Sequence, residues 1–166
     1  PIVEEKFAAE IKNKTLTLLE ADALEFEVAK YVKGNYIAVG NIPYYITGAL
    51  IRKYLTEKHQ PDTLVFLIQK EVAERITHHG PASKKIKESI LSLSVKAYGT
   101  PVYVATVPAG AFTPPPKVDS AILAVTGVSR SHFKTVKQEE RFFELVKAGF
   151  AQKRKLLKRN VEGVLG

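Results

Sequence analysis

The segment of residues 36–47 joins a predicted strand to side chains that could do chemistry. Its first five residues form an apolar run typical of a buried strand, which stops at Asn41 and turns at Pro43. An exocyclic amine such as that of adenine holds its lone pair in the ring, so acceptors on its two hydrogens would make it more nucleophilic. Asn41 Oδ1 and a carbonyl of the Ile42–Pro43 turn could accept them, and the Tyr44 ring could stack on the base. Asn and Pro are also common turn formers, which is the alternative interpretation.

A carboxylate follows another predicted strand. Residues 15–19 alternate in a way that favours a strand, and Asp22 and Ala23 come shortly after it. An aspartate in this place could accept a hydrogen bond from an adenine amino group or from a ribose hydroxyl. The same aspartate could instead cap a helix that begins at Ala23, and this segment alone does not separate the two interpretations.

Phe112 stands at the head of a proline-rich segment. Residues 112–120 read Phe-Thr-Pro-Pro-Pro-Lys-Val-Asp-Ser, and they connect strands predicted over residues 102–107 and 119–126. Three consecutive prolines hold a backbone extended. We therefore expect Phe112 to be held on a rigid support, either as part of a site or as an ordinary core aromatic.

Positive charge gathers towards the C-terminal end. The chain has a net charge of +8, and residues 131–166 hold 9 Lys and Arg against 4 Asp and Glu. This concentration is typical of a surface for a polyanion, although a basic face that aids solubility is the alternative. The candidate phosphate contacts are five cations of one segment: Lys153, Arg154, Lys155, Lys158 and Arg159.

The composition excludes several kinds of site. The chain has no cysteine, which excludes disulfides, thiolate zinc sites and a cysteine nucleophile. His78 and His79 have no acidic or cysteine partner at ligand spacing, so we expect no metal there. No apolar run approaches the length of a membrane span, and we expect a cytosolic or organellar protein.

The order of the predicted elements indicates an α/β fold. Apolar runs predict further strands over residues 36–40 and 63–68, the second buried on both faces. An amphipathic stretch follows each of them, so we expect two strand–helix units with right-handed parallel connections. The two later strands should add an antiparallel edge. The predicted helices cover residues 4–12, 28–33, 48–58, 69–76, 88–97 and 138–150, with Thr47 as the N-cap of the third.

Four segments, taken in order, carry a resemblance to a known family. They are Asp22-Ala23-Leu24, Asn41-Ile42-Pro43-Tyr44, residues 69–75 (Gln-Lys-Glu-Val-Ala-Glu-Arg) and residues 112–120. Together they resemble the ribosomal RNA adenine N6,N6-dimethyltransferase family of the KsgA type, which has mitochondrial relatives. Residues 150–155 are similar to the basic helical segment of that family.

The resemblance implies a fold, an activity and a cofactor. The implied fold is an α/β, Rossmann-like sheet of an S-adenosylmethionine-dependent methyltransferase over residues 1–127, followed by a small basic helical lobe over residues 128–166. The implied activity is N6,N6-dimethylation of adenosines in small-subunit ribosomal RNA, during ribosome biogenesis. We expect a cytoplasmic or mitochondrial monomer without metal. The alternative is a non-catalytic RNA-binding or ribosome-assembly module that kept the fold.

The resemblance also implies roles for single residues. Asp22, Ala23 and Asn41 would contact S-adenosylmethionine. Asn41, Ile42, Pro43 and Tyr44 would form the catalytic corner, with room beside Ile42 for a second methyl group. Tyr44 and Phe112 would hold the target base, and the five cations named above would bind RNA. Catalysis would consist mostly of positioning and of hydrogen bonds to acceptors.

One feature of the family has no match. The glycine-rich cofactor loop and its strand are not found in this sequence, so we expect a fold truncated on its N-terminal side. Residues 15–19 would be the third strand of the implied sheet and residues 36–40 the fourth, with no strand between them. Unpaired backbone groups are costly, so another segment should fill the gap or residues 15–19 should lie elsewhere. We expect residues 1–166 alone to bind S-adenosylmethionine very weakly and not to methylate RNA.

Overall fold

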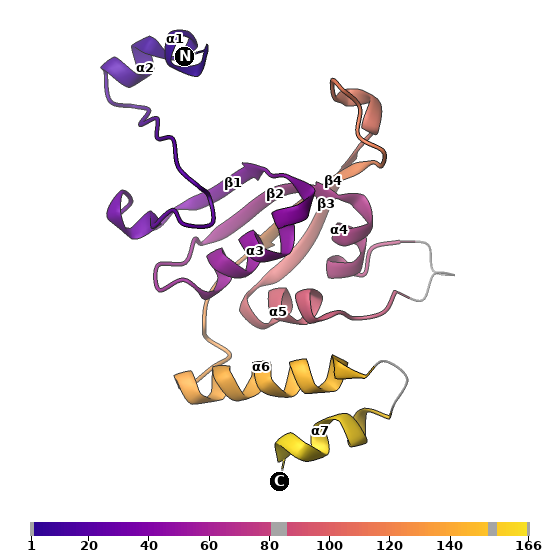
Figure 1. The fold of residues 1–166 in the computed structure, drawn as a ribbon. Helices are drawn as coiled ribbons and strands as arrows, with labels where there is room; N and C mark the ends of the chain where they lie inside the picture. Colours follow the sequence, from indigo (N-terminus) through magenta and orange to yellow (C-terminus); the bar gives the residue numbers. More distant parts are fainter. Residues whose placement is uncertain (1, 81–85, 153–155, 166) are drawn as a thin grey trace.

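A computed structural model describes residues 2–80, 86–152 and 156–165, and it is built on a four-stranded mixed sheet. The strand order is β1-β2-β4-β3 (Figure 1). The first two strands are parallel, and β4 runs antiparallel to both of its neighbours. The strands are β1 (Ile37–Asn41), β2 (Thr63–Gln69), β3 (Thr100–Val107) and β4 (Ser120–Thr126). The parallel pair and the antiparallel edge predicted from the sequence are confirmed.

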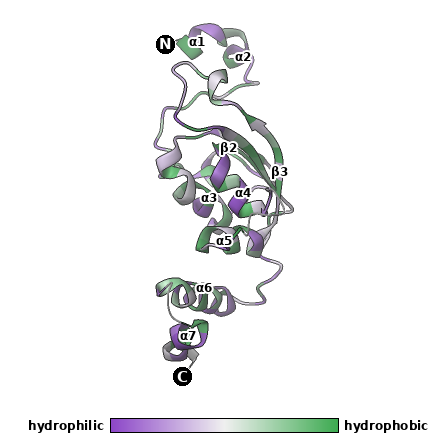
Figure 2. Cartoon of the chain, turned by 90° about the vertical axis from the view of Figure 1, so that its right-hand side faces the viewer, coloured by the Kyte–Doolittle hydropathy of each residue, from purple (hydrophilic) through white to green (hydrophobic). Residues whose placement is uncertain are grey.

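Helices cover one face of this sheet and form the C-terminal part. In Figure 2, α3, α4 and α5 lie on the same side of the strands. The α-helices are α1 (Ile2–Lys6), α2 (Ala8–Lys12), α3 (Thr47–Thr56), α4 (Lys70–Thr77), α5 (Ile90–Tyr98), α6 (Val136–Ala151) and α7 (Leu157–Leu165). Three short 3-10 helices are η1 (Val28–Lys30), η2 (Tyr44–Ile46) and η3 (Ala109–Ala111). The α/β, Rossmann-like fold with a helical C-terminal part is therefore confirmed.

The core lies between the sheet and the helices α3 to α5. Along β2, the side chains of Leu64, Phe66 and Ile68 alternate with less buried neighbours and pack into this core. Leu50, Ile51 and Leu55 of α3 meet them. Burying this many aliphatic side chains supplies the main stabilisation, at roughly 25 cal/mol per Å² of apolar surface.

The opposite face of the sheet has no helix against it in Figure 2. Val39, Val65, Ala124 and Val102 stand opposite one another in register, one from each strand. Val39 is 75% exposed. The prediction that β2 is buried on both faces was therefore wrong, because only one face has a covering layer of helices among the described residues. We call this row of four residues the open row.

The segment before β1 differs from its prediction. Residues 15–19 form no strand, and Leu18 and Leu19 are exposed. Thr15 closes the end of α2, since its backbone N–H and its hydroxyl both donate to Asn13 Oδ1, at 3.0 and 2.7 Å. A strand needs a neighbouring strand for its ladder, and within the described part of the chain these residues have none.

Three helix boundaries also differ. The helix predicted over residues 4–12 is interrupted at Phe7, and the one predicted over residues 28–33 is the three-residue η1. Thr47 is not an N-cap, because η2 runs directly into α3 and gives Thr47 helical dihedral angles. Its hydroxyl is buried and has no hydrogen-bond partner among the described residues.

Arg130 and Tyr98 fasten α6 to the sheet domain. The Arg130 guanidinium donates to the carbonyls of Thr56 and Glu57, at the end of α3, and to Glu139 of α6. The Tyr98 hydroxyl donates to the same Glu139 carboxylate. Burial, together with this carboxylate, raises the pKa of Tyr98, so the phenol stays protonated. The last carbonyls of α3 thus receive their hydrogen bonds from the connection that leads to α6.

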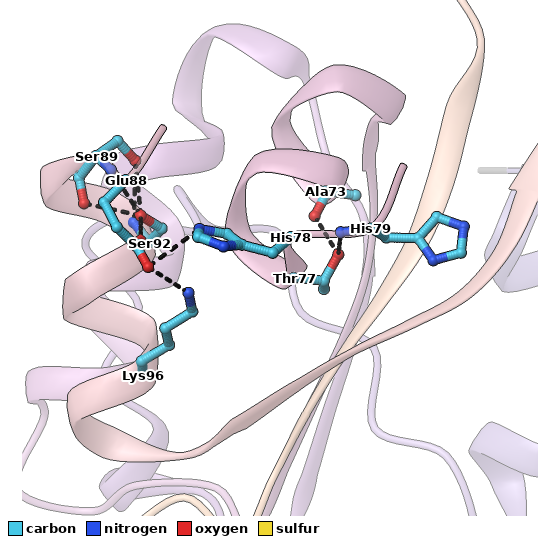
Figure 3. Close-up of polar contacts among 8 residues, drawn as sticks. All are labelled: Ala73, Thr77, His78, His79, Glu88, Ser89, Ser92 and Lys96. Atoms are coloured by element: carbon cyan, nitrogen blue, oxygen red, sulfur yellow. Dashed lines mark hydrogen bonds and ion pairs between the residues drawn. The ribbon is translucent and has the colours of Figure 1, made fainter. Parts of the chain in front are cut away.

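A polar cluster joins the end of α4 to the start of α5 (Figure 3). His78 ends α4 in the left-handed conformation, with φ 56°. Its Nε2 lies 3.0 Å from Glu88 Oε1, and Lys96 Nζ lies 2.6 Å from the same oxygen. Ser92 donates to the other carboxylate oxygen of Glu88 and completes a capping box with Ser89. The cluster therefore fixes α5 against α4.

Glu88 should make stability depend on pH in acid. Burial alone would raise the pKa of Glu88, but hydrogen bonds from Lys96 and Ser92 and the charges of Lys96 and His78 outweigh it and lower this pKa. A lowered pKa in the folded state stabilises the protein above the ordinary value of 4.5, and this contribution is lost as the pH falls through the lowered pKa. Glu88→Gln should lower the free energy of unfolding at pH 7, and the difference from wild type should narrow below pH 4.5.

Urea unfolding of both proteins between neutral pH and acid measures this difference. Glu5→Gln, at an exposed position of α1, serves as the control and should change stability little at any pH. A difference for Glu88→Gln that stays constant on acidification would contradict the assignment.

Candidate functional site

The strand directions bring several chain segments to one edge of the sheet. The carboxyl ends of β1 and β2 lie at this edge because the two strands are parallel. Since β4 is antiparallel, its first residue, Ser120, lies there too, paired with Gln69 of β2 and with Val107 of β3. Asn41, the last residue of β1, pairs with Leu67 in the same region. Ligands of open α/β sheets bind at such an edge.

The catalytic corner predicted at residues 41–44 forms a tight turn at this edge. The Asn41 side chain is exposed, and Pro43 takes an extended conformation, with φ −59° and ψ 136°, before η2 begins. Ile42 instead points into the core and is buried. A Cβ on Gly40 would lie 3.1 Å from the Ile42 side chain and 3.3 Å from the Phe66 ring. The narrow packing under the turn therefore needs glycine at this position.

Tyr44 is hydrogen-bonded to β4, which is separated from β1 by β2 in the sheet. Its hydroxyl lies 2.8 Å from Ser120 Oγ. Ser120 is only 1% exposed, and its backbone belongs to the ladders on both sides of β4. The ring of Tyr44 remains half-buried, whereas the neighbouring Tyr45 is almost fully exposed. The hydrogen bond joins the catalytic corner to the end of the proline-rich segment.

Asp119 connects the remaining segments of the edge. Its carboxylate Oδ1 accepts a hydrogen bond from the backbone N–H of Ala109, at 3.1 Å, at the start of η3. Its backbone carbonyl accepts from the N–H of Lys70, at 3.0 Å, at the start of α4. The Lys70 ammonium lies 3.9 Å from Oδ2, and both side chains are partly exposed. One residue thus holds two helix starts in place.

Phe112 directly follows η3. Its backbone N–H donates to the Ala109 carbonyl at 3.2 Å, and its ring is half-buried. Because Ala109 is held by Asp119, the turn that carries Phe112 is anchored to the same dipeptide that holds Tyr44. The two predicted base-binding aromatics therefore share one support.

Asp22 lies in a turn before β1. Its Oδ1 accepts the backbone N–H of Leu24 at 2.8 Å, and its carbonyl accepts that of Glu25 at 3.1 Å. The carboxylate therefore caps a short turn and does not start a helix at Ala23. Asp22 and Ala23 are exposed, while Leu24 packs against the core. Asp22 is thus joined to its own turn, and among the described residues its Oδ2 has no hydrogen-bond or ion-pair partner.

The basic segment is only partly described. Lys153, Arg154 and Lys155 lie outside the described residues. Lys158 and Arg159 are exposed on α7, which lies at the opposite end of the molecule from α1 and α2 (Figure 1). Asn160 holds α7 against α6 by donating to the carbonyls of Gly149, at 2.9 Å, and Gln152, at 3.1 Å. Lys158 and Arg159 therefore lie in a part of the chain that is separate from the sheet edge.

A cleft of about 1160 Å³ lies elsewhere, between the α4–α5 region and the C-terminal helices. Arg52, Glu71, Arg75, Phe150 and Leu157 are among its lining residues. Its charges are of mixed sign, and none of the predicted site residues that the structure describes lines it. We therefore place the candidate site at the sheet edge, where the polar and aromatic groups converge.

The described ranges contain no candidate metal site and no candidate membrane span. They contain no group of three or more His, Cys, Asp or Glu side chains arranged to hold a metal ion. His79 stacks on Tyr103 with ring centroids 4.1 Å apart, and His78 contacts Glu88, so the two imidazoles point to different partners (Figure 3). None of the helices in these ranges is both long and apolar enough to cross a bilayer.

Sequence reasoning missed the partners that hold the aromatic residues. Ser120, Asp119 and Lys70 belonged to segments that the sequence singled out, but the pairing of Tyr44 with Ser120 joins residues 76 positions apart. The sequence feature that could have indicated these partners is the position of Asp119 and Ser120 at the start of a predicted strand. A polar residue that enters a buried strand needs a partner, and a nearby hydroxyl can supply it.

Gly40→Ala should lower the free energy of unfolding by about 1 kcal/mol, since crowding of Ile42 and Phe66 outweighs the stabilisation that comes from a lower conformational entropy of the unfolded chain. Chemical denaturation measures the change. Gly110→Ala is the matched control, because a Cβ there meets nothing within 4 Å, and it should not destabilise the protein. Equal stabilities of the two variants would show that the turn is not tightly packed.

Comparisons with known proteins show the family of this chain. The model of a family described as ribosomal RNA adenine dimethylase matches residues 2–165. A ribosomal RNA small subunit methyltransferase A from Dehalococcoides mccartyi is 39% identical over 142 residues, which cover 84% of this chain and 47% of that protein. The protein of the same name from Fusobacterium nucleatum is 37% identical over 150 residues, covering 90% of this chain and 55% of that one. The chain thus spans about half the length of the curated relatives it matches.

Solved structures support the same relationship. A dimethyladenosine transferase from Plasmodium falciparum superimposes with a TM-score of 0.73 and 28% identity, over 97% of this chain and 58% of that one. The 23S rRNA methyltransferase ErmE has a TM-score of 0.72 and 23% identity, over 95% of this chain and 59% of its own, and at this identity it supports the fold alone. With the family match over nearly the whole length, these findings show that the chain belongs to the ribosomal RNA adenine dimethylase family.

Proposed function

We propose that residues 1–166 supply the target-base side of an enzyme that dimethylates adenosine N6 in small-subunit ribosomal RNA. The observation that carries this proposal is the hydrogen bond between Tyr44 and Ser120, which joins the Asn41–Tyr44 corner to the segment bearing Phe112. Residues 1–127 would hold the base, and residues 128–166 would contact RNA phosphates. This would occur in the cytoplasm or in an organelle with its own ribosomes.

The methyl donor in this proposal is S-adenosylmethionine. Asp22, Ala23 and Asn41 would contact it, and the exposed carboxylate and amide oxygens of Asp22 and Asn41 suit the amino and hydroxyl groups of a nucleoside. Asp22 Oδ1 already accepts the Leu24 N–H, so this carboxylate is held in one orientation before any ligand binds. When bound, the donor supplies an electrophilic methyl group on a sulfonium.

Asn41 and the turn after it would act on the target amine. Asn41 Oδ1 and a carbonyl of the Ile42–Pro43 turn would accept the two amine hydrogens and turn the nitrogen lone pair away from the ring. Pro43 fixes the backbone of this turn, which keeps the acceptors in place without a cost at the moment of reaction. The ring faces of Tyr44 and Phe112 would hold a base taken out of its stack. No strong base is needed, because the amine can lose its proton after methyl transfer.

Asn41→Ala should reduce methyl transfer to ribosomal RNA by about 10²–10³, since it removes one positioned acceptor from the reacting nitrogen. A methylation assay on the protein produced from its own gene measures this, with small-subunit RNA as the substrate. Asn35→Ala, an exposed asparagine before the other end of β1, is the control and should retain activity.

The assay also tests the proposed activity itself. Wild-type protein that binds this RNA but transfers no methyl group would favour the alternative, a non-catalytic RNA-binding module. Full turnover by Asn41→Ala would remove this residue from the mechanism while leaving the activity in place.

Lys158→Gln combined with Arg159→Gln should weaken RNA binding and reduce the slope of log affinity against log salt by about 1.5, because each lost phosphate contact removes about 0.7–0.9 from the slope. The control replaces Lys12 and Lys33, two exposed lysines of the N-terminal half, with Gln. It makes the same change in net charge and should leave the slope unchanged. Equal slopes for both double variants would contradict the assignment of α7.

A further inference from the structure

We propose that Asp119 and Ser120 form a positioning pair that sets the Tyr44 and Phe112 rings relative to one another for binding the target base. This inference rests on the proposed function. It assigns a role to two residues that do not contact the base. They act only through Tyr44 and Phe112, whose rings would contact it.

Ser120 fixes the position of the Tyr44 ring. The residue is almost completely buried, and its backbone is hydrogen-bonded into ladders with Gln69 and Val107, so β4 fixes the point from which its hydroxyl extends. Tyr44 sits on the 3-10 helix η2 and reaches this hydroxyl at 2.8 Å. A ring tethered at its hydroxyl and at its backbone is held at one position and along one axis.

Asp119 fixes the turn that carries Phe112. Its carboxylate accepts the N–H of Ala109, and Ala109 in turn accepts the N–H of Phe112. The backbone of Asp119 is held from the other side by the N–H of Lys70. Two consecutive residues at the start of β4 therefore hold η3 and Tyr44 in place.

Two consecutive residues thus define the geometry of two rings from distant parts of the chain. A base that inserts next to such rings needs faces at a set separation and angle, and a base-binding site loses affinity when these are free to vary. The pair also explains why a polar dipeptide stands at the start of a buried strand. Each of its side chains has a partner on a different element.

The two ends of the Tyr44–Ser120 hydrogen bond differ in what their loss leaves behind. Tyr44→Phe leaves a buried Ser120 hydroxyl without a partner, whereas Ser120→Ala leaves a half-buried phenol that water can reach. Both changes free the ring from its tether. If Ser120 acts through Tyr44 alone, the second change should add little once the first has been made.

The test measures binding of a short single-stranded RNA that carries 2-aminopurine at one position, by the quenching of its fluorescence on stacking. Ser120→Ala and Tyr44→Phe should each weaken binding about tenfold, and the double variant should bind as weakly as the worse single variant. The same RNA with an abasic site in place of 2-aminopurine, measured as a competitor of the fluorescent RNA, should bind wild type and Ser120→Ala equally, because it has no base to hold. Ser129→Ala, at a half-buried serine bonded to Ser131, is the control and should bind like wild type.

Asp119 is tested with two substitutions. Asp119→Ala removes the acceptor for the Ala109 N–H and should weaken binding of the 2-aminopurine RNA about tenfold. Asp119→Asn keeps an oxygen acceptor there and should largely restore binding, although it removes the charge beside Lys70. Circular dichroism and thermal unfolding of every variant identify any that has lost its fold.

The outcomes separate this inference from the proposed function. Failure of the wild-type protein to quench 2-aminopurine would count against base binding at this edge, and hence against the proposed function. Wild-type binding that is unaffected by Ser120→Ala would overturn the positioning role. The positioning role would also be overturned if the losses of affinity of the two single variants multiplied in the double variant. It would be overturned as well if Ser120→Ala lost as much affinity for the abasic RNA as for the 2-aminopurine RNA. Equal losses for Asp119→Asn and Asp119→Ala would overturn the part assigned to Asp119.

Discussion

The placement of β2 between a parallel and an antiparallel neighbour is the constraint on which the rest of the structure depends. Parallel pairing with β1 puts the carboxyl ends of both strands on one edge, and antiparallel pairing with β4 brings the start of that strand to the same edge. Strand pairing alone therefore brings segments that are remote in sequence close together. The Tyr44–Ser120 hydrogen bond is a consequence of this register.

The attachment of the C-terminal helices follows from a different kind of interaction. Arg130 satisfies the last carbonyls of α3 and meets Glu139, while the rings of Tyr98 and Phe133 pack edge to face, with centroids 5.7 Å apart. A guanidinium suits this position because its fixed fork of donors can serve two carbonyls and a carboxylate at once. The basic α7 is therefore carried on α6, which the sheet domain holds firmly.

Sequence reasoning succeeded where the signal is local. β1, β2 and β4 were predicted within a residue or two, because apolar β-branched runs there end at Asn, Gln or Gly, and the family was recognised from short motifs. It failed for residues 15–19, since a strand exists only with a neighbour and residue pattern does not reveal the neighbour. It also missed the partner of Ser120, because a hydrogen bond between distant segments depends on register. The roles of Asn41, Phe112 and Asp22 remain predictions.

The open row bears on how readily copies of the chain associate. Val39 and Val102 lie on the two outer strands of the described sheet, and β1 presents one side of its backbone without a strand partner. An apolar face that ends in an unpaired strand edge is a template on which other chains can add strands. Strand addition to the described sheet would be opposed by the mutual repulsion of the positive charges and favoured by salt, which screens them.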